Sequence, residues 1–284
     1  PNLMHRIVFL TAAITLVVVT PNVAAAPSTI FVNGKIYTVD NENPWVEAIA
    51  ITNDRISALG ENKAIRDLAS AQTRIIDLEQ RMVMPSIHDA HSHMLLAGLK
   101  WTYECQLPQG ADATTIIATL KQCAEALGPD EWLVGGDYNP NVFGDVPVNK
   151  DFLDKAFPDR PVYLYDYSIH HALVNSKALA VAEITNDTPN PPQGKIARDP
   201  ATGNATGVLV ESATALVSRV IPPYPTFAYE DAMRFAIDRC HQYGITSVQE
   251  ASGTPRLLAL YRDFDQYDAL DLRVMTHIVW SSEK

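Results

Sequence analysis

Two histidines that stand one residue apart, His91 and His93, are the residues of this sequence best suited to chemistry. In an extended strand, alternate side chains point to the same face. Both imidazoles would therefore leave one face of a strand, and Asp89 would lie on that face two residues earlier. Neutral imidazole is the commonest nitrogen ligand for zinc and other divalent metals. The spacing predicts a pair of metal ligands, although two ordinary polar residues at a strand end would give the same short pattern.

The element that must position this pair is a strand that ends at His93. Residues 83–87 are mostly apolar or β-branched, with one interrupting proline. The histidines would then lie at the carboxyl end of the strand, where a (β/α)8 barrel keeps its chemistry. Two further strands are predicted at 245–250 and 272–279, each preceded by a helical pattern. This alternation indicates an α/β fold with parallel strands.

A small β-rich region comes before that strand. Strands are predicted at 29–32 and 35–39, and the Asn-Gly pair between them predicts a hairpin. A second turn, at Asn53-Asp54, is expected to join two more strands. The resulting small antiparallel sheet, over 27–84, is too small to be stable alone. We therefore expect it to be a subdomain of a larger fold.

Residues 100–225 read as a long mixed region. Asp112 is placed to cap a helix. The segment 185–206 is rich in Pro, Gly, Asn and Thr, which predicts an irregular surface excursion. A further helix is predicted to begin within 207–211.

Two residues of this region, His170 and Glu211, are candidates for substrate binding. His170 and His171 precede a helix that Asn175 would cap, and a histidine pair in such a place is more often a capping or packing feature than a site. Glu211, expected on an apolar helix face, could be a ligand, a substrate anchor or, more commonly, a partnered structural carboxylate. For both residues, a binding role and a purely structural role stay open.

The first 26 residues have the pattern of a secretory signal peptide. Two basic residues, His5 and Arg6, precede an apolar run over 7–19, and small residues follow at 23–26. The apolar run is short for a bilayer span, so cleavage near Ala25 is favoured over an uncleaved anchor. The sequence predicts export to the periplasm or the medium, and a mature chain without a stable membrane anchor.

Charge and cysteine content narrow the class of protein. The formal net charge is −11 at pH 7 and no cluster of Lys or Arg stands out, so a nucleic acid is not an expected partner. Three cysteines in an exported protein leave one unpaired. Cys105 and Cys123 flank a loop and a helix, which favours a disulfide between them. Cys240 lies in an apolar helical pattern, which is more typical of a buried thiol than of a nucleophile.

Several motifs in a fixed order resemble the metal-dependent amidohydrolase superfamily. The N-terminal motifs are strand, Asn-Gly turn, strand, then AIAITNDRISALG, RIIDLEQRMVMP and HDAHSH. The usual form of the last element is P-G-F-x-D-x-H-x-H. This sequence has Ser86 and Ile87 in place of Gly and Phe, and it keeps Pro85, the aspartate and both histidines.

The region after His93 resembles one branch of that superfamily, amidohydrolase family 3, and is similar to N-substituted formamide deformylases. The motifs that carry this resemblance are W-x-x-G-G at 132–136, P-V-x-L at 161–164, H-x-A-L-V-N-S-x-A-L at 170–179 and T-G-x-x-x-G-V-L-x-E at 202–211.

The resemblance implies a (β/α)8 barrel in which residues 245–250 and 272–279 are the second and third strands. A complete barrel needs eight strands. The predicted fold class is therefore α/β, an incomplete (β/α)8 TIM-like barrel with about three strands and a large insertion after the first, plus a small N-terminal β-sandwich subdomain. The predicted parts are the signal peptide (1–26), the β subdomain (27–84) and the N-terminal portion of the barrel (85–284), with the insertion at about 100–225.

The resemblance also implies the chemistry. One or two divalent ions, zinc in the first place, would make a bound water acidic, and hydroxide would attack an amide-like carbon of a small-molecule substrate. His91 and His93 would be metal ligands, and Asp89 would support one of them. The catalytic carboxylate expected of the family lies beyond Lys284. Since zinc normally takes at least three protein ligands, this chain by itself is expected to be inactive.

Two hypotheses from different classes follow. The first is an exported hydrolase of carbon–nitrogen bonds other than peptide bonds. The second is a non-catalytic exported binding or interaction protein that retains the front half of the fold. Amides, formamides, ureas and cyclic imides all stay open as substrates, because loops rather than the fold set the substrate. The oligomeric state is not indicated.

Overall fold

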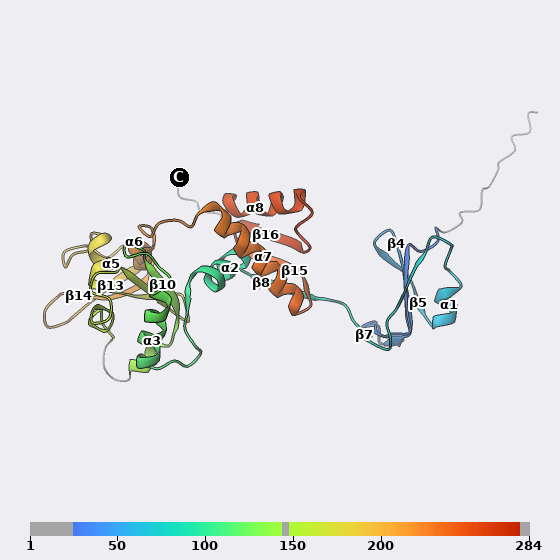
Figure 1. Ribbon diagram of the computed structural model, residues 1–284, viewed down its shortest axis with the longest axis horizontal. Helices are drawn as coiled ribbons and strands as arrows, with labels where there is room; N and C mark the ends of the chain where they lie inside the picture. Colours follow the sequence, from blue (N-terminus) through green and yellow to red (C-terminus); the bar gives the residue numbers. More distant parts are fainter. Residues whose placement is uncertain (1–24, 144–147, 279–284) are drawn as a thin grey trace, which may run out of the picture. The chain divides into compact units, whose positions relative to one another are not determined.

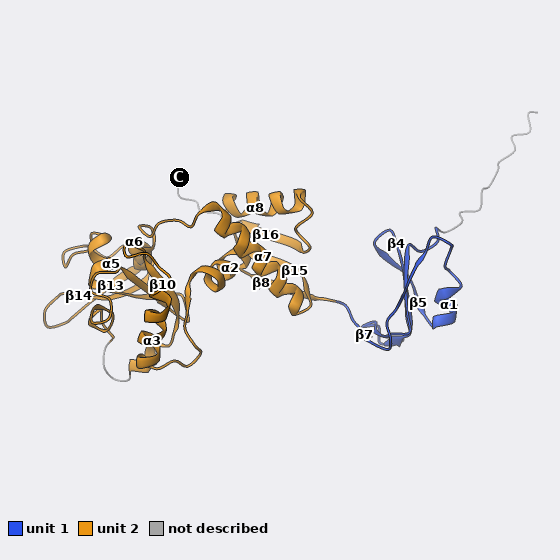
Figure 2. Ribbon diagram, viewed as in Figure 1, with its two compact units in different colours: residues 1–85 blue, residues 86–284 orange. Residues whose placement is uncertain are grey.

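The computed structural model describes residues 25–143 and 148–278 (Figure 1). The predicted signal peptide thus lies almost entirely outside the described residues. The chain forms two compact units, residues 1–85 and 86–284 (Figure 2). Among the described residues, no helix combines the length and the apolar character that a bilayer crossing needs.

The first unit contains two small sheets, one of four strands in the order β5-β4-β1-β6 and one of three in the order β3-β2-β7. Its core lies between the four-stranded sheet and a short helix, where Ile30, Val32, Ala48 and Ala50 surround Ile65. The elements are β1 (Thr29–Val32), β2 (Lys35–Tyr37), β3 (Trp45–Val46), β4 (Ala48–Thr52), β5 (Arg55–Gly60), α1 (Asn62–Arg66), β6 (Arg74–Asp77) and β7 (Met82–Val83).

The hairpin predicted at Asn33-Gly34 is wrong. β1 pairs with β4 and β6, whereas β2 pairs with β3 and β7, so this turn leads the chain from one sheet to the other. A two-residue type I′ hairpin needs positive φ at both central residues, and here only Asn33 has it. Asn53 and Asp54 both have positive φ, and they do join the antiparallel pair β4 and β5. Because β6 pairs in parallel with β1, and β7 in parallel with β2, each sheet is mixed rather than antiparallel.

The second unit begins with the strand that leads into the histidine pair. Three parallel strands form a sheet in the order β16-β15-β8. Apolar side chains of its helices pack on one face, among them Met233, Leu257 and Phe264 around Val248. The elements are β8 (Ile87–Ser92), α2 (Met94–Tyr103), α7 (Thr226–Gln242), β15 (Ile245–Gly253), α8 (Pro255–Gln266) and β16 (Arg273–Ile278).

Helix α2 starts directly after β8 and lies very close to α7. A Cβ atom built on Gly98 would overlap the backbone oxygen of Ala232 in α7. Only a glycine allows the two helix backbones to approach this closely. Since His93 is the residue before the first turn of α2, this packing also fixes where the end of β8 lies.

Between α2 and α7 the chain forms a six-stranded sheet in the order β13-β14-β12-β11-β10-β9. Alternate residues of its strands enter different cores: Leu164 and Leu173 pack with helix α3, while Val174 packs with α5 and α6. The elements are β9 (Cys105–Gln106), α3 (Ala113–Ala124), β10 (Leu133–Tyr138), η1 (Pro140–Phe143), α4 (Asp151–Asp154), β11 (Val162–Asp166), β12 (His171–Val174), α5 (Ser176–Val181), β13 (Gly194–Arg198), β14 (Ala205–Glu211), η2 (Ser212–Thr214) and α6 (Ala215–Ser218).

Two predictions for this region are wrong. Residues 205–211 form strand β14 rather than the start of a helix, because their alternate residues are buried and the strand pairs on both sides, with β12 and β13. Glu211 therefore ends a strand and does not lie on a helix face. The segment 185–206 is not wholly irregular either, since it contains β13 and the first residues of β14.

Other local predictions are confirmed. Asp112 caps α3 by accepting from the backbone N–H of Thr115, and Asn175 caps α5 by accepting from that of Ala178. Cys105 and Cys123 form a disulfide, with their Cα atoms 5.8 Å apart. That bond fastens α3 to the edge strand β9, where the apolar residues of the helix pack on the sheet.

Candidate functional site

The predicted metal ligands lie side by side at the carboxyl end of β8. The ring centroids of His91 and His93 are 5.1 Å apart, and the ring planes are nearly perpendicular. Two imidazoles bound to one tetrahedral zinc, each with a Zn–N distance of about 2.0–2.1 Å, have centroids roughly 5 Å apart. The spacing of the pair therefore fits a shared metal ion. β8 itself ends at Ser92, and His93 is already the N-terminal cap residue of α2.

An irregularity in β8 changes the position of Asp89. Val248 pairs with Asp89 and Glu250 with Ser92, so β8 has one residue more than β15 between these two pairs. Such a bulge interrupts the alternation of side chains, and the predicted common face for Asp89 and the histidines does not follow. Asp89 Oδ1 accepts from the backbone N–H of His91 rather than from its ring, at 3.1 Å.

The carboxyl group of Asp89 is close enough to α7 to act on a cysteine there. Burial, and secondarily the charge of Asp89, raise the pKa of the Cys240 thiol. The thiol is therefore protonated at neutral pH and is a poor nucleophile, which agrees with the expectation for Cys240.

Sequence reasoning missed Glu250, a buried carboxylate beside the pair. It lies near the carboxyl end of β15, and its side chain is 1% exposed. Its oxygens accept from the backbone N–H groups of Met94 and Ser252 and from the hydroxyl of Tyr261, at 3.0 to 3.2 Å. His93 Nδ1 lies 3.5 Å from Glu250 Oε1. The available signal was an acidic residue at the carboxyl end of a predicted barrel strand, where functional groups gather.

A separate row of polar side chains crosses the same three strands. His88 Nδ1 lies 2.7 Å from the hydroxyl of Ser247, and Gln249 bridges His88 to His277 with two contacts of 3.2 Å. Both ring nitrogens of His88 are thus in contact with neighbouring side chains. Neither ring of the pair His91 and His93 is committed in that way among the described hydrogen bonds, which distinguishes the pair from the third histidine of the motif.

The pair is only part of a metal site. Within residues 25–143 and 148–278, no three His, Cys, Asp or Glu side chains are arranged to hold a metal ion. Zinc usually takes three or four protein ligands. The described residues therefore supply a fitting pair of nitrogen donors and no complete coordination shell.

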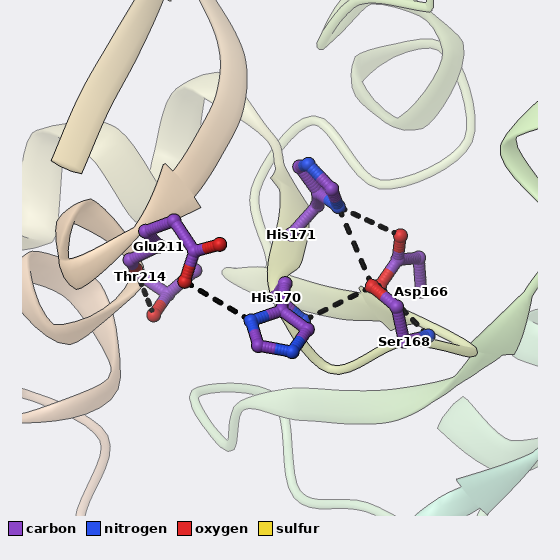
Figure 3. Close-up of polar contacts among 6 residues, drawn as sticks. All are labelled: Asp166, Ser168, His170, His171, Glu211 and Thr214. Carbon is purple, nitrogen blue, oxygen red and sulfur yellow. Dashed lines mark hydrogen bonds and ion pairs between the residues drawn. The ribbon is translucent and has the colours of Figure 1, made fainter. Parts of the chain in front are cut away.

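A second group of polar residues lies at one end of the six-stranded sheet (Figure 3). His171 Nδ1 is 2.9 Å from Asp166 Oδ2, and the side chain of Asp166 is only 3% exposed. Ser168 donates to the other oxygen of Asp166 from both its hydroxyl and its backbone N–H. Asp166 is thus a buried acceptor with three donors, and it fixes which nitrogen of His171 faces the protein.

The other histidine of this group has its own carboxylate. His170 Nδ1 lies 3.0 Å from Glu211 Oε2, and the two side chains are 60% and 54% exposed. The backbone of Glu211 has φ 52° and ψ −130°, a sparsely populated region that costs on the order of 1–3 kcal/mol and often occurs at functional sites. The hydroxyl of Thr214 donates to the Glu211 carbonyl at 2.8 Å and supports this turn. In Figure 3 the rings of His170 and His171 point away from each other.

A cavity of about 390 Å³ separates α2 from the six-stranded sheet. Leu96 and Lys100 of α2, with Glu104 just after the helix, line one side, and tyrosines of β11 together with Ile169 line the other. Lys100 pairs with Asp137 at 3.0 Å, so its charge is already compensated. Two of its lining residues lie close along the chain to the two polar groups, since Leu96 follows His93 by one helical turn and Ile169 directly precedes His170.

Glu104 is the carboxylate of this cavity. The hydroxyls of Tyr165 and Tyr224 donate to it, at 2.6 and 3.4 Å. Burial raises the pKa of Glu104, and the hydrogen bond from Tyr165 opposes that rise. Burial, and secondarily the charge of Glu104, raise the pKa values of Tyr165 and Tyr224, so both hydroxyls remain donors at neutral pH.

Comparison with known proteins identifies the family. The model of the amidohydrolase family matches residues 74–283. Putative amidohydrolase YtcJ of Bacillus subtilis is 32% identical over 216 residues, which are 75% of this chain and 40% of the relative. N-substituted formamide deformylase of Arthrobacter pascens is 27% identical over 241 residues, 82% of this chain and 44% of the relative.

A solved structure has the same fold. An uncharacterized metal-dependent hydrolase from Pyrococcus horikoshii OT3 superposes with a TM-score of 0.64 at 22% identity, over 88% of this chain and 48% of that one. The chain spans less than half of the length of each of these three proteins. The family match covers far more than half of the chain, and the predicted family is confirmed: this chain belongs to the amidohydrolase family.

Proposed function

We propose that this chain carries the first metal ligands of a hydrolase that cleaves carbon–nitrogen bonds other than peptide bonds, such as those of amides or formamides. The observation that carries the proposal is the histidine pair, with ring centroids 5.1 Å apart at the carboxyl end of a parallel strand. A relative named N-substituted formamide deformylase supports the choice of bond. The incomplete (β/α)8 barrel, with β8, β15 and β16 as its first three strands, is part of the same proposal.

His91 and His93 would hold one divalent ion, for which we propose zinc. The complete site would hold one or two such ions. When bound, such an ion lowers the pKa of a water toward neutrality and polarises the carbonyl oxygen of the substrate. The remaining ligands and the base would be residues that the structure does not describe, since the described ones contain no three-residue group. Asp89 would support His91 through its backbone N–H.

His170 and Glu211 are the proposed substrate-binding residues. Both are more than half exposed, so a ligand can reach them. With Nδ1 of His170 facing Glu211, its Nε2 is free to contact a polar atom of a substrate. Ile169, the residue before His170, lines the cavity against α2, and this neighbourhood supports the proposal.

The test combines metal content with amine release. The protein that carries this sequence is expected to bind zinc in equilibrium dialysis and to release amine from N-substituted formamides or amides. His93→Ala should remove both properties. Zinc binding that survives His93→Ala would contradict the proposed ligand, and absence of both zinc and hydrolysis in the unaltered protein would favour the non-catalytic binding protein. We also propose export, which secretion of a C-terminally tagged chain would test.

A further inference from the structure

We propose that Glu250 is a positioning residue for His93: it holds the Nδ1 side of the ring, so that Nε2 is presented to the metal. The inference rests on the proposed function for the identity of the metal ligand. The inference goes beyond the proposed function, because Glu250 lies on another strand than the histidines, and neither the histidine motif nor the family match points to Glu250.

The sheet itself brings Glu250 to the end of β8. Glu250 of β15 pairs with Ser92 of β8 in the parallel register, so the carboxylate lies next to the point where β8 gives way to α2. Three donors, the N–H groups of Met94 and Ser252 and the hydroxyl of Tyr261, hold its two oxygens. A carboxylate fixed from three directions cannot follow the ring of His93, so the ring must orient relative to it.

The chemistry of the pair sets the tautomer. A carboxylate only accepts hydrogen bonds, so a neutral His93 that faces it carries its proton on Nδ1 and its lone pair on Nε2. The Nδ1 to Oε1 distance of 3.5 Å is longer than an N–H···O hydrogen bond, so the structure shows a close electrostatic contact, of a kind that commonly tightens when a site binds its ligand. Carboxylates that hold the far nitrogen of a metal-bound histidine orient the ring and make it a better ligand.

The burial of Glu250 also has an electrostatic meaning. Its side chain is 1% exposed, and among the described ion pairs its partner is His93 rather than a Lys or Arg. A buried charge is costly unless an opposite charge or several hydrogen bonds compensate it. A cation on the far side of the His93 ring would add that compensation. Glu250 thus links the free energy of metal binding to the free energy of keeping a carboxylate inside the sheet.

A purely structural alternative has to be separated from this role. The bond from the Met94 N–H to Glu250 satisfies one of the free backbone donors at the start of α2, and a negative charge is favourable there. Glu250 could therefore stabilise the helix without affecting the ring. Stability and zinc affinity must be measured on the same variants to distinguish the two roles.

The experiment compares Glu250→Gln with Glu104→Gln. Glu104 serves as the control, because it is a half-buried carboxylate that accepts from tyrosine hydroxyls, and no hydrogen bond or ion pair to a histidine is described for it. Zinc affinity is measured by competition with a chromophoric chelator, and stability is measured on the zinc-free proteins by thermal unfolding. We expect Glu250→Gln to weaken zinc binding by about 10- to 100-fold. We expect Glu104→Gln to leave it unchanged, whatever each variant does to the melting temperature.

A second readout does not depend on metal. In zinc-free protein with 15N-labelled histidine, NMR is expected to find the proton of neutral His93 on Nδ1, and Glu250→Gln should move it toward Nε2. A proton on Nε2 in the unaltered protein would overturn the inference, even if Glu250→Gln failed to fold. So would a folded Glu250→Gln variant with unchanged zinc affinity. An unaltered chain that binds no zinc, while His93 keeps its Nδ1 proton only in the presence of Glu250, would instead refute the proposed metal site.

Discussion

The two sheets of the second unit each end in a pair of histidines with carboxylates nearby, and the pairs differ in spacing by one residue. His91 and His93 have one residue between them, and their rings lie 5.1 Å apart. His170 and His171 are adjacent in sequence, and their rings point away from each other (Figure 3). His91 lies near the end of β8 and His93 is the cap residue of α2, and this backbone brings their rings together, whereas adjacent residues of extended backbone point to opposite faces. The first pair can therefore offer two nitrogens to one ion.

The carboxylates differ in the same sense. In the six-stranded sheet each histidine has a carboxylate of its own, Asp166 for His171 and Glu211 for His170. In the three-stranded sheet a single buried carboxylate, Glu250, lies beside one histidine of the pair, and the ring of the other has no such partner among the described contacts. Separate partners suit two independent polar contacts. One partner and two free nitrogens suit a shared cation.

The largest effect is expected from changing the spacing while keeping both histidines. The combined change His91→Ser and Ser92→His makes the first pair adjacent, like His170 and His171. Because the two rings would then leave the backbone in different directions, we expect zinc affinity to fall by about 100-fold or more, beyond what losing a supporting residue costs. Equilibrium dialysis measures this. Zinc affinity equal to that of the unaltered chain would remove the basis of the comparison.

The disulfide bond lies in the region of the six-stranded sheet and not in that of the three-stranded sheet, among the described residues. Cys105 and Cys123, separated by 18 residues, join α3 to the six-stranded sheet, whereas the cysteine packed beside the three-stranded sheet is free. A crosslink of this loop length contributes about 3 kcal/mol to the free energy of unfolding. Urea unfolding with and without reductant should show a loss of this size. The variant with both cysteines changed to serine serves as the control, and it should not respond to reductant.

The two carboxylates of the six-stranded sheet should differ in their effect on stability. Asp166 is buried with three donors, and Asp166→Ala would leave those donors without a partner, at a cost of about 2–3 kcal/mol. Glu211→Ala removes an exposed ion pair worth at most about 1 kcal/mol. Denaturant midpoints of the two variants measure the difference. Equal losses would mean that the exposed pair is structural rather than available to a ligand.

The smallest effect is a pH dependence in the cavity between the two regions. Since burial raises the pKa of Glu104, the folded chain binds this proton more tightly than the unfolded chain does. The resulting stability is fully present below the ordinary glutamate pKa of 4.5 and is lost as the pH rises through the raised value. Glu104→Gln lacks this titration, so it should gain stability relative to the unaltered chain between acidic and neutral pH. Parallel urea midpoints for both proteins would contradict the raised pKa.

Local signals in the sequence were sufficient for caps, for most strands and for the family. Asp112, Asn175 and the disulfide partners depend on neighbours close along the chain, and each is found as predicted. Glu211 was assigned to the wrong element because its strand is defined by partners on both sides. The same apolar run without those partners is compatible with a helix.

The candidate site was predictable only in part, for a similar reason. The histidine spacing can be read from the six residues 88–93 alone. The bulge in β8 and the approach of Glu250 depend instead on how β8 pairs with β15, some 160 residues later in the chain. Asn33-Gly34 shows the same limit on a smaller scale. The turn residue has the expected left-handed backbone, yet its strands pair with segments that the dipeptide does not encode.

The position of the metal ligand His93 also depends on Gly98, a residue with no side chain of its own. It lies about 7.5 Å along the helix from His93, at 1.5 Å per residue, and its missing side chain lets α2 pack against the backbone of Ala232. A methyl group at this position would overlap the Ala232 oxygen and push α2 away from α7. The first residue of α2, next to His93, would then move away from the end of β8. A redesign of this protein should therefore keep Gly98 as well as the two histidines.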